Sequence, residues 1–410
     1  MILAQNHQQQ LSGNKFWCII FMSCFLLACS PKVTTHKTPK KEEAAKEEAA
    51  VKTEKKFTEA NIALLVPFNL NLASIRSGSK AEMEKSVMAI DFYQGFKMGI
   101  DSAAAAGLNF RLKVLDTRDN NDQILSLIKS GQLSGSDLIV GPVFPEGIKF
   151  ITNYSVANSV PVVSPLAATH PDEFLNPNLI SMVNNIDLHA EKIGNFITKE
   201  FDPAKTIVAL ISTRKSADET LAIPVRSYFK KDKGAKFTFQ EYSSVYALET
   251  ARDPAKQYIV IMSSSDRQFV VATIDKLVKM KNSGMQIDLF GHPNWPKQNY
   301  STEKLQLLHT RVTTSYWVDY KNPAVISFVR KYRNLNHFEP GEYAFKGFDA
   351  GFYFGKVMAE HGTNYLRYLP AEKYKGLQNS YLFKKDDQLG YINTSLFLLE
   401  YKNYALNPVE

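Results

Sequence analysis

Short apolar runs alternate with longer amphipathic segments along most of this chain. Residues 61–68 form a nearly continuous apolar run, which is typical of a strand that is buried on both faces. In residues 86–107 the apolar positions, among them Ile90, Phe96 and Ile100, recur at helical spacing. The same alternation continues through the chain. It predicts parallel sheets covered by helices on both sides.

The expected elements fall into two successive sets, which favours two α/β lobes over one large sheet. Strands are expected at residues 61–68, 110–116, 137–143, 160–166, 206–213, 236–243, 258–264, 287–293 and 310–317. Helices are expected at residues 86–107, 121–131, 147–159, 223–231, 267–284, 325–335 and 342–362. Residues 380–403 hold two β-rich runs joined by a polar turn, and they predict an antiparallel hairpin.

The start of the chain differs from this pattern. Behind Lys15, the 13 residues Phe16–Ala28 carry no charge, whereas a membrane-spanning helix needs roughly 20 apolar residues. A short apolar run of this kind is typical of a secretory signal. "LLAC", which ends at Cys29, resembles the lipobox of bacterial lipoproteins. That resemblance implies that residues 1–28 are removed and that Cys29 carries lipid. The alternatives are a plain signal peptide or an anchoring helix.

Charge and cysteine content narrow the function classes. Residues 29–56 are expected to form a charged tether, because they hold almost nothing apolar to bury. The formal net charge is +8, but the part from Phe57 onward has 40 basic and 36 acidic residues, a net +4. This balance and the export signal argue against a nucleic-acid partner. The three cysteines are Cys18, Cys24 and Cys29, and the first two would be removed with the signal. The mature chain would then hold only Cys29, so it would have no disulfide and no cysteine metal site.

The order of several segments resembles the type I periplasmic-binding-protein fold, the class of the leucine/isoleucine/valine-binding proteins. The segments are "DLIVGPV", "VPVVSPLAATHPDEF" and "FVRKYRNLNHFEPGEYAFKGFDAG". The lipobox and "LLVPFN…DFYQGF" also resemble lipoproteins of Bacteroidota-like bacteria with this fold. The resemblance implies two doubly wound parallel-sheet lobes joined by a hinge that the chain crosses three times. It places residues 57–185 and 306–365 in lobe 1, and residues 186–305 and 366–410 in lobe 2.

A ligand site is expected where the parallel strands end, because ligands of open α/β sheets lie beyond the carboxyl ends of the strands. These ends are rich in hydroxyl groups, proline, asparagine and aromatic rings, which would suit a small polar or aromatic ligand. The same residue types are also common turn formers. The expected ligand-binding residues are Phe68, Phe144, Ala167, Ala168, Thr169, Thr213, Ser264 and Trp295.

The family pattern is not complete at this site. Relatives that bind amino acids have a serine after the "GP" strand, where this chain has Phe144 and Pro145. They also have an acid in the second lobe, whereas residues 291–295 hold none. A ligand's ammonium group would lack a partner, and a buried unpaired charge is costly, so amino-acid binding is doubtful.

Catalysis is not expected. The sequence has no G-x-S-x-G, H-E-x-x-H, P-loop or G-x-G-x-x-G motif, and its eight histidines are scattered. We therefore expect no catalytic residues, no metal and no cofactor. His292, near Trp295, is the one histidine that stands at a predicted strand end.

Two functions remain. The leading hypothesis is a lipid-anchored periplasmic solute-binding protein, on the outer rather than the inner membrane, that closes two lobes on a small ligand and hands it to an ABC-type permease. The alternative is an interaction protein without a small ligand. The fold resembles the activator domains of peptidoglycan synthases, so the partner would then be a cell-wall enzyme.

Overall fold

The computed structural model describes residues 57–70, 79–231 and 233–409. The predicted signal (1–28), the lipidated Cys29 and the tether (29–56) lie outside the described residues and stay predictions. Among the helices that the structure describes, none is both long enough and apolar enough to cross a membrane.

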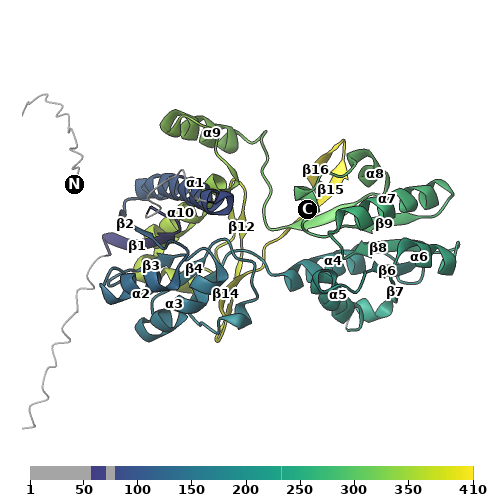
Figure 1. Cartoon of the computed structure of the whole chain (residues 1–410), viewed down its shortest axis with the longest axis horizontal. Coiled ribbons are helices and arrows are strands. Elements are labelled where there is room, and N and C mark those ends of the chain that lie inside the picture. Colours follow the sequence, from purple (N-terminus) through teal and green to yellow (C-terminus); the bar gives the residue numbers. More distant parts are fainter. Residues whose placement is uncertain (1–56, 71–78, 232, 410) are drawn as a thin grey trace, which may run out of the picture. The chain divides into compact units, whose positions relative to one another are not determined.

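Two seven-stranded sheets, each with helices around it, carry the fold (Figure 1). The strands are β1 (Glu59–Val66), β2 (Asn109–Asp116), β3 (Leu138–Val140), β4 (Val162–Ser164), β5 (Leu179–Ser181), β6 (Thr206–Ile211), β7 (Thr238–Tyr242), β8 (Gln257–Met262), β9 (Ile287–Phe290), β10 (Arg311–Thr314), β11 (Tyr374–Lys375), β12 (Ser380–Tyr381), β13 (Phe383–Asp386), β14 (Gly390–Asn393), β15 (Phe397–Lys402) and β16 (Ala405–Pro408). The α-helices are α1 (Lys80–Ala103), α2 (Asn121–Lys129), α3 (Pro145–Asn158), α4 (Ile186–Glu200), α5 (Ser216–Phe229), α6 (Val245–Ala251), α7 (Arg267–Asn282), α8 (Thr302–Leu307), α9 (Pro323–Asn336) and α10 (Glu342–His361). Short 3₁₀ helices are η1 (Ala104–Ala106), η2 (Pro171–Glu173), η3 (Gly234–Lys236), η4 (Trp295–Lys297) and η5 (Gly362–Arg367).

We call lobe 1 the part built on the sheet β13-β14-β5-β4-β3-β1-β2, and lobe 2 the part built on β16-β15-β10-β9-β8-β6-β7. From β1 to β5 all pairings in lobe 1 are parallel, as are those from β6 to β10 in lobe 2. Antiparallel pairings occur at one end of each sheet, where β13 pairs with β14 in lobe 1 and β15 pairs with both β10 and β16 in lobe 2, and in the separate two-stranded sheet β11–β12. The predicted fold class, two parallel-sheet α/β lobes, is confirmed.

Each central strand is buried on both faces because helices cover both sides of its sheet. In β1, Ile62 and Leu64 belong to one apolar cluster, whereas Ala63 and Leu65 belong to another on the opposite face. In lobe 1, α1 and α10 pack together over one face, and α2 and α3 pack together (Figure 1). Successive residues of a strand point to opposite faces, so a covered sheet needs the continuous apolar run seen in the sequence.

Glycines bring α1 and α10 into close contact. A Cβ on Gly95 of α1 would lie 1.9 Å from the carbonyl oxygen of Ala344, and one on Gly347 of α10 would lie 2.1 Å from that of Phe92. The two helices therefore approach each other at a distance that only glycine permits at these positions. The "FKGFDAG" segment of the sequence forms this contact surface.

The chain passes between the two sheets three times, after β5, after β10 and after β14. Its division differs from the expected one. Residues 311–314 form β10 of lobe 2, where they pair with β9, although residues 306–365 were expected in lobe 1. Residues 383–393 form the predicted hairpin, but β14 pairs in parallel with β5 of lobe 1, although residues 366–410 were expected in lobe 2. Long-range strand pairing, which local patterns do not encode, decides these memberships.

All three crossings leave a sheet at the carboxyl end of a parallel strand, and the two that enter lobe 2 arrive beside such an end, since His189 at the start of α4 lies 2.8 Å from Thr313 of β10. The first follows Ser181 of β5, and the third follows Asn393 of β14, which runs parallel to β5. The second follows Thr314 of β10, and β15 begins opposite that residue, with Phe397 paired to Thr314. The first and third connections therefore join the carboxyl edge of one sheet to the carboxyl edge of the other. Ligands of open α/β sheets bind at this edge.

Candidate functional site

Predicted residues of lobe 1 lie at its carboxyl edge with part of each side chain exposed. Phe68 follows β1, is half-buried, and meets the Tyr93 ring of α1 edge-on at a centroid distance of 5.9 Å. Phe144, also half-buried, precedes α3, and Nζ of Lys85 lies 5.2 Å from its ring centroid. Thr169 is half-buried in the loop after β4. Phe68 and Phe144 both lie beside α1 and pack against the same apolar cluster of lobe 1.

The alanines before Thr169 differ in accessibility. Ala167 is buried, whereas Ala168 is exposed. Of this tripeptide, therefore, Ala168 and Thr169 have surface available to a ligand.

A cavity of about 300 Å³ opens between the ends of β2 and β3 and the starts of α2 and α3. Its lining includes Thr117, Asn120, Phe144 and Glu146, and of the eight predicted ligand-binding residues only Phe144 is among them. Larger surface cavities, of about 680 Å³ and about 610 Å³, lie between α2 and α3 and between α4 and α5. Each of these cavities is lined from one lobe.

Two of the expected ligand-binding residues are fully buried in lobe 2. Trp295 is fully buried, its Nε1 donates to the carbonyl oxygen of Ser264 at 3.0 Å, and its ring lies 5.4 Å from that of Tyr300. Ser264 is also fully buried, and its hydroxyl accepts from the backbone N–H of Asp266 at 3.2 Å. Both residues belong to the core of lobe 2. The Trp295 ring is stable there because its N–H group finds an acceptor, the carbonyl oxygen of Ser264, inside the protein. Neither presents surface to a ligand.

Thr213 is half-buried and already has a partner. Its hydroxyl donates to Oδ2 of Asp218 at 2.5 Å, and its backbone N–H donates to the same oxygen at 3.1 Å. Asp218 lies in the first turn of α5 and is buried. The role of Thr213 in this structure is to connect the end of β6 to the start of α5.

A row of buried polar residues runs along the carboxyl edge of lobe 2, and among its members the sequence pointed only to His292. Nδ1 of His189, at the start of α4, lies 2.8 Å from the hydroxyl of Thr313 in β10. Nδ1 of His292, after β9, accepts from the backbone N–H of Asn294 at 3.1 Å. Burial lowers the pKa of His189 to about 3 and that of His292 to about 4, while nearby Asp218 acts on His292 in the opposite direction. Both rings are therefore neutral at pH 7.

Charged groups of α5, of β7 and of the loop after β6 are paired with one another. Arg226 donates to Glu241 at 2.7 Å and to Glu219 at 3.2 Å, and Arg214 contacts Glu241 at 2.5 Å. The hydrogen bond from Arg226 lowers the pKa of Glu219. Both acids are thus engaged by arginines. They offer no free carboxylate for a ligand's ammonium group, in line with the doubt about amino-acid binding.

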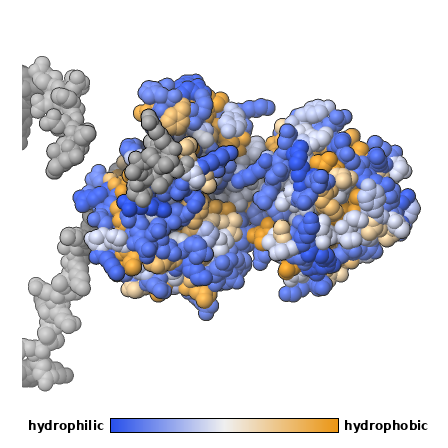
Figure 2. Space-filling model, in the orientation of Figure 1, coloured by the Kyte–Doolittle hydropathy of each residue, from blue (hydrophilic) through white to orange (hydrophobic). Residues whose placement is uncertain are grey.

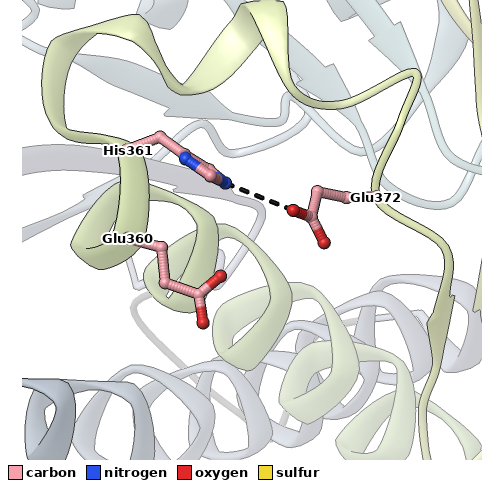
Figure 3. A group of neighbouring side chains, drawn as sticks. All are labelled: Glu360, His361 and Glu372. Carbon is pink, nitrogen blue, oxygen red and sulfur yellow. Dashed lines mark hydrogen bonds and ion pairs between the residues drawn. The ribbon is translucent and has the colours of Figure 1, made fainter.

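One group of side chains has the chemistry of a metal site. Figure 3 shows Glu360 and His361 at the end of α10, with Glu372 opposite. The one interaction drawn joins Nε2 of His361 to Glu372, at 3.2 Å, while Glu360 pairs with Lys356 at 3.6 Å. The His361 ring also stacks on Tyr368 at 3.7 Å. These contacts account for the arrangement as a surface ion pair, and we assign no metal to it.

Figure 2 shows one face of the surface, on which hydrophobic residues lie in small groups among hydrophilic ones. The coloured residues on that face form no broad apolar area of the kind that marks an obligate protein interface.

Comparison with known proteins identifies the fold. The sequence matches no protein-family model and no curated protein. Among solved structures, a protein of Rhodospirillum rubrum described as a branched-chain amino acid ABC transporter aligns with TM-score 0.62 and 14% identity, over 86% of this chain and 99% of that one. An ABC transporter substrate-binding protein of Desulfitobacterium hafniense, in complex with Leu, aligns with TM-score 0.53 and 13% identity, over 86% of this chain and 100% of that one.

A third neighbour has a different role. The C-domain of LpoA from Haemophilus influenzae, a regulator of PBP1A, aligns with TM-score 0.55 and 14% identity, over 86% of this chain and 100% of that one. At these identities the likeness establishes architecture and not activity. The chain thus has the type I periplasmic-binding-protein fold.

Proposed function

We propose that this chain is a lipid-anchored periplasmic solute-binding protein that closes its two lobes on a small ligand and hands it to an ABC-type transporter. One observation carries the proposal: the first and third crossings join the carboxyl edges of the two parallel sheets. These edges are where α/β sheets bind ligands, and a hinge that connects them lets both edges contact one molecule. Closure around the ligand requires no covalent chemistry.

The ligand surface that we propose lies mainly on lobe 1. It consists of the partly exposed residues Phe68, Phe144, Ala168 and Thr169. Two aromatic rings and one hydroxyl suit a ligand with an apolar face and at least one hydrogen-bonding group. Thr213 of lobe 2 contributes if its hydroxyl, now held by Asp218, changes partner.

A thermal-shift screen of amino acids, peptides, nucleosides and cell-wall fragments tests the proposal. A ligand that binds only the folded state raises its stability by about 2.7 kcal/mol at a hundredfold excess over Kd. The shift should disappear in Phe144→Ala and Thr169→Val. It should persist in Thr363→Val, a matched change at an exposed threonine of η5. A hit that survives both lobe 1 substitutions would contradict the proposed surface.

The second candidate is an interaction protein, such as an activator of a cell-wall synthase. The burial of Trp295 and Ser264 favours it, because these residues leave less of lobe 2 for a ligand. A purified peptidoglycan synthase, assayed with and without this protein, separates the candidates. A rate increase without any small-molecule thermal shift supports the interaction protein, and the reverse result supports the solute-binding protein.

A further inference from the structure

Four side chains connect the two lobes beside the second crossing. Lys297 belongs to η4 of lobe 2, Tyr316 lies in the crossing after β10, and Glu342 and Lys346 lie at the start of α10 of lobe 1. Nζ of Lys297 is 3.7 Å from Oε1 of Glu342 and 5.3 Å from the Tyr316 ring centroid. Nζ of Lys346 is 4.3 Å from the same ring centroid and pairs with the same carboxylate.

The two lysines differ in how firmly they are held. The Lys346 side chain is only 11% exposed, and it also lies 5.1 Å from the Tyr343 ring centroid. It therefore stays with Glu342 as part of lobe 1. The Lys297 side chain is 55% exposed, and its carboxylate partner is on the other lobe. Rotation of lobe 2 would separate this pair while the groups on α10 remain in place.

Tyr316 contacts charged groups of both lobes. Its ring receives one ammonium group from each lobe, and it stands in a segment that must bend if the lobes rotate. Tyr316 also bridges to Asn379, and the backbone N–H of the next residue, Trp317, donates to the carbonyl oxygen of Gln378 at 2.8 Å. The segment around Tyr316 is thus fixed on the lobe 1 side. The contact with Lys297 is the exchangeable one.

We propose that Lys297, Glu342 and Tyr316 form a breakable clasp that sets the resting equilibrium between two arrangements of the lobes. The proposal concerns the conformational control of the proposed ligand site and rests on the proposed function for its effect on affinity. A solvent-exposed ion pair shifts a two-state equilibrium by up to about fivefold, which biases the populations without locking them. A ligand that favours one arrangement would then bind with an affinity that depends on the clasp.

The test measures the interlobe distance directly, without a ligand. In the full chain with Cys18, Cys24 and Cys29 changed to Ser, spin labels are attached to cysteines at the exposed positions Asn153 of α3 and Thr250 of α6. Double electron–electron resonance then gives the distance distribution. We expect Lys297→Met to change the ratio of two populations by up to about fivefold, and 1 M NaCl to produce the same change in the unsubstituted chain.

Controls separate the clasp from general effects of charge and salt. Lys279→Met, a matched change at an exposed lysine in the last turn of α7, should leave the distribution unchanged. Salt should have no further effect on Lys297→Met, and Lys297→Met combined with Glu342→Gln should match the single variants. A single distance that is the same with and without Lys297 overturns the clasp.

The ligand experiment distinguishes this inference from the proposed function. If a screened ligand binds, and Lys297→Met changes its affinity by the same factor as the fraction of molecules in the binding arrangement, the clasp and the solute-binding function both stand. If the ligand binds equally well to Lys297→Met, the proposed effect of the clasp on affinity fails and the solute-binding function remains. If the distances respond to Lys297→Met but no ligand binds, the clasp stands and the solute-binding function fails.

Discussion

Asp349 offers the sharpest test of how the structure holds the region beside the second crossing. This carboxylate of α10 is fully buried and accepts from the backbone N–H groups of Leu377, Gln378 and Asn379 at 2.7, 2.8 and 2.7 Å. The Tyr374 hydroxyl donates to it at 3.3 Å. One side chain therefore fixes three consecutive backbone groups onto α10.

The cost of removing this carboxylate follows from its partners. Asp349→Ala leaves three N–H groups without their acceptor, and each unsatisfied buried donor costs about 1–3 kcal/mol. Water entry and the relief of a buried charge offset part of this cost. We expect a loss of about 3–5 kcal/mol for Asp349→Ala and about 1–2 kcal/mol for Asp349→Asn, whose amide oxygen can still accept.

The pH dependence that Asp349 gives to the stability of the unsubstituted chain has a defined sign. Burial raises the pKa of Asp349 from 3.8 to about 6, although the backbone hydrogen bonds act in the opposite direction. The folded state therefore binds the proton more tightly than the unfolded state. The part of the stability that is linked to this protonation is complete below about pH 4 and is lost as pH rises through 6, whereas the three backbone hydrogen bonds to the carboxylate remain. Asp349→Asn should remove this dependence.

Urea unfolding followed by circular dichroism measures both effects. Glu360→Ala is the matched control, because Glu360 is an exposed acid on the same helix, and its loss should cost less than about 0.5 kcal/mol. If Asp349→Ala unfolds within about 1 kcal/mol of the unsubstituted chain, the three backbone hydrogen bonds do not hold this region as described.

Four further predictions follow from other parts of the molecule. Burial lowers the pKa of His189 to about 3 and of His292 to about 4, against 6.5 when unfolded, so these two rings should lower stability by up to about 2.7 kcal/mol per pH unit as pH drops below 6.5, and the opposite contribution of Asp349 offsets at most about half of this; a net increase in stability between pH 6.5 and 5 in urea titrations would contradict the neutral buried rings. Gly347→Ala should destabilise by about 2 kcal/mol or more in thermal melts, because its Cβ would lie 2.1 Å from the Phe92 carbonyl oxygen, whereas helix propensity alone predicts a gain of about 1 kcal/mol. Trp295→Ala should cost about 3–5 kcal/mol in the same assay, and a near-neutral result would return Trp295 to the ligand site. Cys29→Ser should move the protein from the membrane fraction to the soluble fraction, and continued membrane association on fractionation would refute the lipid anchor.

The sequence predicted the elements of the sheets well because burial on both faces imposes a strong local pattern. The runs at residues 61–68 and 206–213 correspond to β1 and β6. It did not predict β5, which is only three residues long, or the exchange of β10 and β14 between the lobes. Strand pairing between residues far apart in the chain determines that exchange, and the expected boundaries relied on the order of segments alone.

Apolar periodicity also overstated burial at the start of α1. Val87 and Ile90 fit the helical spacing, yet their side chains are 60% and 41% exposed, whereas Phe96 and Ile100 of the same pattern are buried against α10 and the sheet. Apolar spacing predicts the helix, but it does not show which part of the helix is covered by other elements.

The expected site residues have more exposed surface in lobe 1 than in lobe 2. Strand ends were located correctly in both lobes, so Phe68, Phe144 and Thr169 lie at the expected edge with surface exposed. Trp295 was misplaced because its acceptor, the carbonyl oxygen of Ser264, comes from another strand end and has no local signal. In the buried row of His189, His292 and Asp218 the sequence pointed only to His292, because the three members come from separate elements.

Native mass spectrometry of the protein isolated without denaturation is the most direct test of the central claim, that the two lobes hold a small molecule. The account predicts a population heavier than the bare chain by the mass of one small molecule. This population should disappear after unfolding, dialysis and refolding, and it should return when the low-molecular-weight fraction of the source cells is added. A single mass equal to the bare chain, both in the isolated protein and after that addition, would contradict the claim.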